Sequence, residues 1–235
     1  MVLKGLKSLT SLTLLNNNIK SIEKYSFADL NNVTELDLMF NQLETIEAET
    51  FIGLNSIIAL ILQYNQISKI EYNAFDGLKY LTKLWMNHNL IKKIDLKTFV
   101  GLHSLKELLL LGNLIETIED HSFDNLQNVE ILDLSYNNLT EIKHDLFSKM
   151  NNLKGFNLSN NKLTILNNSR LFENKTRLNY IDFSMNQIWF VNANDFRNLS
   201  TLVHLSLMSN QLKTLDFNLV QGNYFYHYYY HFNKF

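Results

Sequence analysis

Residues 81–93 read LTKLWMNHNLIKK, and the frame behind this stretch, Leu-x-x-Leu-x-Leu-x-x-Asn-x-Leu, returns with aliphatic variants along most of the chain. Within the frame Leu84 and Met86 lie two residues apart, as the inward side chains of a β-strand do. Trp85 lies between them, so the same alternation places a large aromatic side chain on the outer face. The sequence therefore predicts a repeated strand whose outer face carries an unexpected apolar residue.

The asparagine of the frame sets its period. It recurs every 24 residues, with one interval of 25 residues before the eighth copy. The nine members of this asparagine ladder are Asn17, Asn41, Asn65, Asn89, Asn113, Asn137, Asn161, Asn186 and Asn210. The chain must leave the strand at this position, and an amide side chain can satisfy backbone groups that the bend leaves without partners. We expect all nine to be structural.

Each copy has a second half, in which an aliphatic residue is followed by a phenylalanine. The phenylalanine column consists of Phe27, Phe51, Phe75, Phe99, Phe123, Phe147, Phe172 and Phe196. One copy cannot bury its own leucines, so the copies must stack with parallel strands about 4.8 Å apart. Because phenylalanine is wider than leucine, we expect the second halves on the outer arc of a curved solenoid.

These motifs resemble the leucine-rich repeat family over nearly the whole chain, and the 24-residue length with a phenylalanine column resembles its typical subfamily. The resemblance implies an α/β-type solenoid. This is a curved leucine-rich repeat horseshoe with a parallel β-sheet on the concave face and irregular or short helical segments on the convex face. The subfamily includes Toll-like receptor ectodomains, Slit-like guidance proteins and insect immune repeat proteins. The resemblance therefore also implies an extracellular or cell-surface location for this protein.

Composition argues against several function classes. The 235 residues are 46% hydrophobic and 19% charged, which is enough to bury a substantial core. The formal net charge is −2 with both signs mixed along the chain, so there is no basic stripe for nucleic acid. No apolar run has the length of a membrane helix, and no phosphate-binding loop or nucleophile motif is present. We expect a non-catalytic protein with no cofactor, no nucleic-acid partner and no membrane span.

The domain organisation follows from the frame. Residues 1–220 are predicted to form the solenoid, with nine asparagine-containing repeats after a partial N-terminal repeat. The cysteine-containing caps usual in the resembled family are missing, so we expect a fragment of a longer receptor-like protein. The aromatic segment 221–235 fits no repeat column. It could cap the last repeat, lie at a membrane surface, or have no stable structure.

Two site interpretations are weak. An acidic column could in principle bind calcium, although repeat register explains it more simply; its members are Glu23, Glu47, Glu71, Asp95 and Glu119. His227 and His231 have the spacing of a helical metal site but lack a third ligand. Among the glycosylation sequons, Asn167 and Asn174 lie in an irregular insertion and are the preferred acceptors.

The outward strand positions hold a candidate binding surface. The middle strand column carries Ile61, Trp85 and Leu109 in three successive repeats, amid polar residues in the others. Neighbouring columns add Met39, Phe40, Tyr64, His88, Leu111, Ile131 and Tyr136. We call these ten residues the apolar patch and expect them on repeats two to six with a charged rim. Such a patch on a rigid sheet is typical of a protein interface.

Three functions remain open at this point. The chain could be a recognition module that captures a protein ligand on its concave face, with the indole of Trp85 largely exposed in the isolated chain. It could instead be a structural or adhesive protein that forms a homodimer through the apolar patch. It could also be the targeting part of a larger receptor enzyme.

Overall fold

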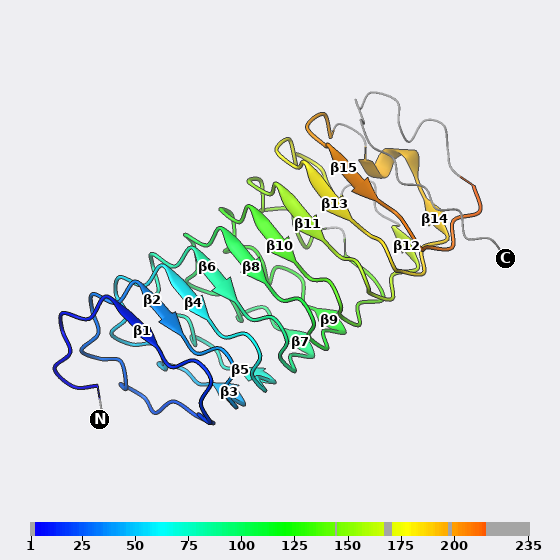
Figure 1. The fold of residues 1–235 in the computed structure, drawn as a ribbon. Coiled ribbons are helices and arrows are strands. Elements are labelled where there is room, and N and C mark those ends of the chain that lie inside the picture. The colour runs from blue at the N-terminus through cyan, green and yellow to red at the C-terminus, as the bar shows by residue number, and fades with distance from the viewer. Residues whose placement is uncertain (1–2, 144, 167–170, 197–198, 215–235) are drawn as a thin grey trace.

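The computed structural model describes residues 3–143, 145–166, 171–196 and 199–214, and these form a parallel-strand solenoid (Figure 1). Its main sheet has nine strands in the order β1-β2-β4-β6-β8-β10-β11-β13-β15. The strands are β1 Ser11–Thr13, β2 Glu35–Asp37, β4 Ala59–Ile61, β6 Lys83–Trp85, β8 Glu107–Leu109, β10 Ile131–Asp133, β11 Gly155–Asn157, β13 Tyr180–Asp182 and β15 His204–Ser206. The predicted fold class is confirmed. The expected tail, 221–235, lies outside the described residues.

The sheet repeats one register from strand to strand. Leu36 faces Leu60, Leu60 faces Leu84 and Leu84 faces Leu108, so the inward leucines form a continuous row. These side chains are fully buried, whereas the residues on either side of each point out of the sheet. The period of two in the strand therefore fixes which residues build the core and which face outward.

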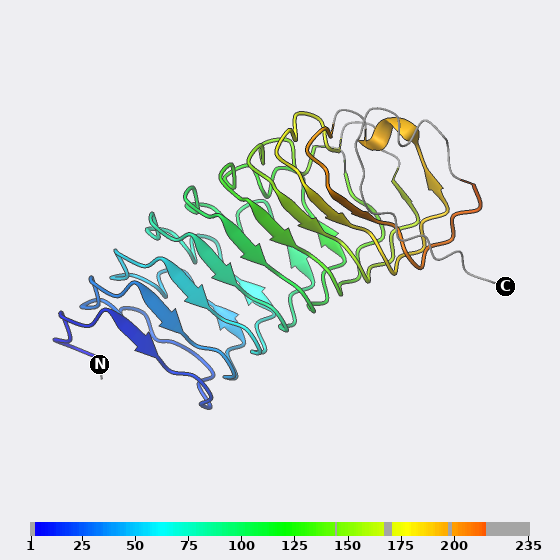
Figure 2. The ribbon, with the colours of Figure 1, turned by 45° about the horizontal axis from the view of Figure 1, so that its top comes forward.

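The return half of each repeat contains little regular structure. Three two-stranded parallel ladders lie apart from the main sheet in Figures 1 and 2. They pair β3 Thr45–Ile46 with β5 Lys69–Ile70, β7 Lys93–Ile94 with β9 Thr117–Ile118, and β12 Ile165–Leu166 with β14 Phe190–Val191. The helix assigned among the described residues is a single 3-10 turn, η1, at Ala193–Phe196. The remaining connections are turns.

Phenylalanine rings fill the outer half of the core. From Phe27 to Phe147 successive rings of the column stack with centroids 5.9 to 6.4 Å apart. Each ring comes from one repeat, so the stack links neighbouring repeats by apolar contact, as the leucine rows do on the strand side. The parallel ring stack runs along repeats one to six, within one hydrophobic core that extends from Phe27 to Leu202.

The ladder asparagines join neighbouring repeats through their amides. Asn113 donates from Nδ2 to the carbonyl oxygens of Met86 (3.0 Å) and Leu110 (2.9 Å), and its Oδ1 accepts from the Ile91 N–H (3.2 Å). Asn17, in the first repeat, is exposed and donates only within its own repeat, to Leu14 and Leu15. An interior ladder residue therefore satisfies buried backbone groups on two repeats at once.

Repeats seven to nine have a less regular core. Phe156 occupies a strand leucine column and meets Phe147 edge to face at 4.7 Å, which ends the parallel ring stack. Lys175 occupies the column of Leu126 and Met150 and is only 1% exposed. Its Nζ donates to three oxygens, of Ser148 (3.4 Å), Asn151 (3.3 Å) and Glu173 (3.2 Å). Burial lowers the pKa of this ammonium below its ordinary value of 10.5.

Candidate functional site

Three apolar side chains lie side by side on the outer face of the sheet. The register pairs Ile61 with Trp85 and Trp85 with Leu109, across β4, β6 and β8. All three are half-buried, whereas the residues before and after each of them, leucines except for Met86, are fully buried. The same register places Asp37 of β2 beside Ile61, and Asp133 of β10 beside Leu109. We call Ile61, Trp85 and Leu109 the apolar row, and it is bounded by a carboxylate at each end.

Trp85, at the centre of the apolar row, is less exposed than strand alternation predicts. Its indole Nε1 is buried and has no hydrogen-bond partner, and Lys83 Nζ lies 5.7 Å from the ring centroid. The expectation of a largely exposed indole is therefore wrong. The reason is local: strands about 4.8 Å apart bring the large side chains of Ile61 and Leu109 against both sides of the ring.

A second row of side chains lies on the turn that follows each strand. The ring of Phe40 stacks on Tyr64 and Tyr64 stacks on His88, with centroids 4.6 and 4.3 Å apart. All three have φ between 51° and 54°, in the left-handed region that aromatic residues enter at a cost. Gly112 and Asn160 hold the same turn position in other repeats and suit that backbone better. We call Phe40, Tyr64 and His88 the aromatic stack.

Gly112 ends the aromatic stack. It has φ 68°, and a Cβ at this position would lie 2.7 Å from His88 Nδ1. The imidazole therefore fills the space that a side chain on repeat five would otherwise take. Tyr136, in the following repeat, is 59% exposed and separated from His88 by this ringless position.

The remaining members of the apolar patch lie beside these two rows. Met39 and Leu111 are half-buried, two residues after the ends of β2 and β8, and Ile131 is exposed at the first position of β10. The ten predicted residues thus lie on the strands of repeats two to six or on the turns that follow them.

Sequence reasoning missed a set of side-chain caps on the same face. In four repeats the residue of the middle strand column, which is the last residue of its observed strand, accepts at Oδ1 the backbone N–H two residues later. These residues are Asp37 (2.9 Å), Asp133 (2.9 Å), Asn157 (3.0 Å) and Asp182 (2.8 Å). The apolar row cannot make this bond. At Leu111 the N–H instead donates to Asn87 Oδ1 of the preceding repeat, at 3.1 Å. Three adjacent repeats therefore carry apolar groups where others carry a stabilising acceptor. The recurring Asp and Asn of this column were the available signal.

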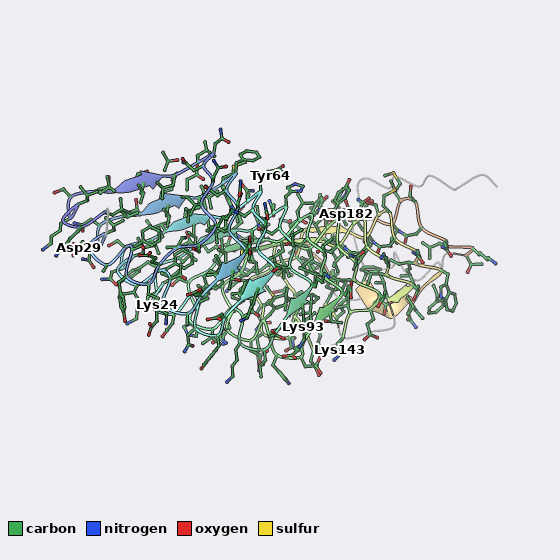
Figure 3. The ribbon with its side chains drawn as sticks, turned by 90° about the horizontal axis from the view of Figure 1, so that it is seen from below. Lys24, Asp29, Tyr64, Lys93, Lys143 and Asp182 are labelled. Atoms are coloured by element: carbon green, nitrogen blue, oxygen red, sulfur yellow. The ribbon has the colours of Figure 1, made fainter. Side chains whose placement is uncertain are left out.

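The acidic column lies away from this face and bonds to the protein itself. Glu71 and Glu119 each accept a backbone N–H from the preceding repeat, at 3.3 and 2.8 Å. Lys93 lies 2.6 Å from both Asp95 and Glu119, and these hydrogen bonds raise the pKa of its ammonium. Figure 3 shows Lys93 on the side opposite Tyr64. In the described part of the chain, no group of three His, Asp or Glu side chains could hold a metal ion.

Of the predicted glycosylation acceptors and the histidines considered as metal ligands, the structure describes Asn174. Asn174 is exposed on a turn with φ 60°, so its amide is open to solvent. Asn167, His227 and His231 lie outside the described residues.

A family comparison matches most of the chain. The family model for leucine rich repeats matches residues 2–43, 32–91, 79–139 and 127–173. The comparison with curated proteins gives no match. No enzyme family is indicated by these comparisons.

Solved structures are similar over most of this chain. A chain of the TLR13–ssRNA13 complex is 30% identical over 90% of this chain, with a TM-score of 0.84. A chain of an octameric complex of Latrophilin 3, Unc5D and FLRT2, in which FLRT2 supplies the leucine-rich repeats, is 27% identical over 84%, with a TM-score of 0.76. A leucine-rich repeat protein of Leptospira interrogans shares the fold, with 24% identity over 92% and a TM-score of 0.74. The matched region spans 30%, 60% and 59% of those chains respectively.

Proposed function

The chain belongs to the leucine-rich repeat family, and from this premise we propose that it is a non-catalytic module that captures a protein ligand on the concave face of repeats two to six. We place it in a receptor-like or secreted recognition protein, at the cell surface or outside the cell, as the typical subfamily suggests. Among the described residues, no helix has both the length and the apolar character needed to cross a membrane.

The observation that carries this proposal is the apolar row. A solenoid folds with polar residues at the middle strand position, as repeats two, six, seven and eight show, and there they also cap the backbone. Ile61, Trp85 and Leu109 forgo that cap and leave apolar surface at the solvent side of the sheet. Contiguous apolar surface with an aromatic centre and a polar rim is the composition of a binding hot spot.

A displayed library of random peptides tests the proposal, because it samples many ligand chemistries at once. The library is panned on the immobilised protein, and the enriched peptides are measured against Leu109→Ser and Trp85→Ser. We expect each substitution to weaken binding by about 2 kcal/mol or more, because hot-spot residues lose most of their contribution on truncation.

Val203→Ser supplies the matched control. Val203 is also an exposed apolar residue, 61% exposed, but it lies in repeat nine outside the apolar patch. The Val203→Ser variant should bind the enriched peptides with the same affinity as the wild type. Failure to enrich any peptide, or equal loss of binding with Val203→Ser, would contradict a binding site on repeats two to six.

A further inference from the structure

We infer that the ligand of this face is a cationic protein segment, with lysine or arginine on both sides of an apolar centre. This inference rests on the proposed function and adds the chemistry of the partner. It follows from how charge is distributed around the apolar row.

The strands of the main sheet carry carboxylates in excess. Their charged residues are Glu35, Asp37, Glu107, Asp133 and Asp182, with Lys83 as the one cation. Within the described residues none of these six is in an ion pair, whereas some of the acids outside the main sheet are paired. The pairs are Lys24–Glu49, Lys69–Glu71, Lys93–Asp95, Lys93–Glu119, His121–Asp124, Lys143–Asp120 and Lys154–Glu130. Lys83 is therefore the single cation beside five carboxylates on the strands of this face, and it forms an ion pair with none of them.

The carboxylates are held in fixed positions. The bond from Oδ1 to the backbone leaves Oδ2 of each aspartate with neutral donors only: Asp37 with Thr13 Oγ1 (3.5 Å), Asp133 with Asn157 Nδ2 (3.4 Å) and Asp182 with Tyr180 Oη (3.3 Å). A rigid carboxylate with a long neutral contact can accept a cation at little cost in side-chain entropy.

The spacing of these groups defines the partner further. Asp37, the apolar row and Asp133 occupy five neighbouring strands in the order acid, three apolar residues, acid. At about 4.8 Å per strand the two aspartates are about 19 Å apart. A cationic segment crossing the strands would therefore need basic residues about six positions apart if extended, or about thirteen apart if helical.

Two other occupants fit this face less well. A phosphate backbone would meet unpaired carboxylates, and both ring faces of Tyr64 are already covered within the aromatic stack, so bases could not stack on it. A second copy related by a two-fold axis at Trp85 would bring Asp37 against the partner's Asp133, two like charges. The cationic segment alone complements both the charge and the apolar centre.

The sequences and affinities of the peptides enriched by panning test whether the ligand is a cationic segment. Peptides whose binding depends on Leu109 should contain an excess of Lys and Arg around an apolar or aromatic centre. Raising the salt concentration should weaken the binding of these peptides. The charge variant is Asp37→Asn with Asp133→Asn, since Asn157 shows that asparagine keeps the backbone cap at this position. We expect about tenfold weaker binding with this double variant, at an unchanged melting temperature.

The control removes the same charge elsewhere. Glu44→Gln with Glu116→Gln neutralises two exposed carboxylates outside the main sheet, and should leave binding unchanged. Peptides that need Leu109 but show no basic excess and bind the Asp37/Asp133 variant normally would overturn this inference while leaving the proposed function standing. Saturable binding of single-stranded oligouridylate that is lost in Leu109→Ser would overturn both.

Discussion

Repeats two to six and repeats seven to nine share one fold but differ in the regularity of their core and in the polarity of their outer face. The first group has a regular core, with leucine rows and a parallel phenylalanine stack, and an outer face that gives up polar caps in three strands. The second group has edge-to-face rings and a buried lysine in its core. On its outer face Asn157 and Asp182 keep their caps, and Tyr180 stacks on His204. The regular core thus carries the strands without polar caps, while the less regular core carries strands whose surface residues stabilise the backbone.

The largest expected effect lies inside the regular group. Leu84→Ser should destabilise the protein by about 3 to 5 kcal/mol, because it removes a fully buried side chain and buries a hydroxyl. The adjacent Trp85→Ser should cost about 1 kcal/mol, since that ring is only half-buried. Urea unfolding of the two variants gives the comparison. Equal losses would assign Trp85 to the core and remove the main support for a binding face.

Next in size is the loss of a ladder amide. Asn113→Ala removes three hydrogen bonds to buried backbone groups on two repeats, and should cost about 2 to 3 kcal/mol. Asn17→Ala should cost less than about 1 kcal/mol, because Asn17 is exposed and bonds only within its own repeat. Thermal unfolding distinguishes them, and similar losses at both positions would refute a ladder that acts by linking repeats.

A third substitution should make the irregular group resemble the regular one. Lys175→Met places in repeat seven the residue found at this column in repeat six, Met150, and should stabilise the protein by about 1 kcal/mol at pH 7. The gain arises because a buried ammonium is replaced by an apolar side chain of similar length. Denaturant unfolding at pH 7 measures it, and Lys149→Met, at an exposed position, is the control.

The pH dependence of this gain has a fixed sign. Since the pKa of Lys175 is lower in the folded state than the ordinary 10.5, the unfolded chain binds more protons between the two values. Wild-type stability should therefore rise with pH in the interval just below 10.5, relative to Lys175→Met. An advantage of Lys175→Met that stays constant over that interval would show that the lysine is not destabilised by charge burial.

The smallest effect is expected where the two groups differ most at the surface. Ile61→Asn imitates Asn157, which caps a backbone N–H and donates to Asp133 on the preceding strand. Ile61 likewise has an aspartate, Asp37, beside it on the preceding strand. The lost packing on Trp85 and the gained cap should nearly cancel, leaving stability within about 0.5 kcal/mol. Peptide binding should fall with this variant. A loss of several kcal/mol would mean that the apolar row is structural.

The sequence was sufficient for the fold because the fold depends on a period. A 24-residue interval with leucines two apart specifies stacked parallel strands without reference to any single contact. The exposure of Trp85 was predicted wrongly, since alternation gives the direction of a side chain but not how far its neighbours cover it. The caps from Asp37 and its counterparts lie within one repeat and recur in the sequence, but recurrence alone does not identify the backbone N–H that each side chain accepts. The burial of Lys175 depends on oxygens of the preceding repeat, which no pattern within one repeat contains.

The common register also makes whole repeats interchangeable at the level of the gene. From β2 to β11 every strand faces residues 24 positions away, so in-frame deletion or duplication of one such unit keeps the same backbone register at the boundary that it creates. Recombination within this part of the coding sequence could therefore lengthen or shorten the main sheet, and with it the apolar row, by one strand, about 4.8 Å, at each event. In the asparagine ladder only the interval from Asn161 to Asn186 is 25 residues long instead of 24, so an exchange with that segment would change the spacing between paired strands.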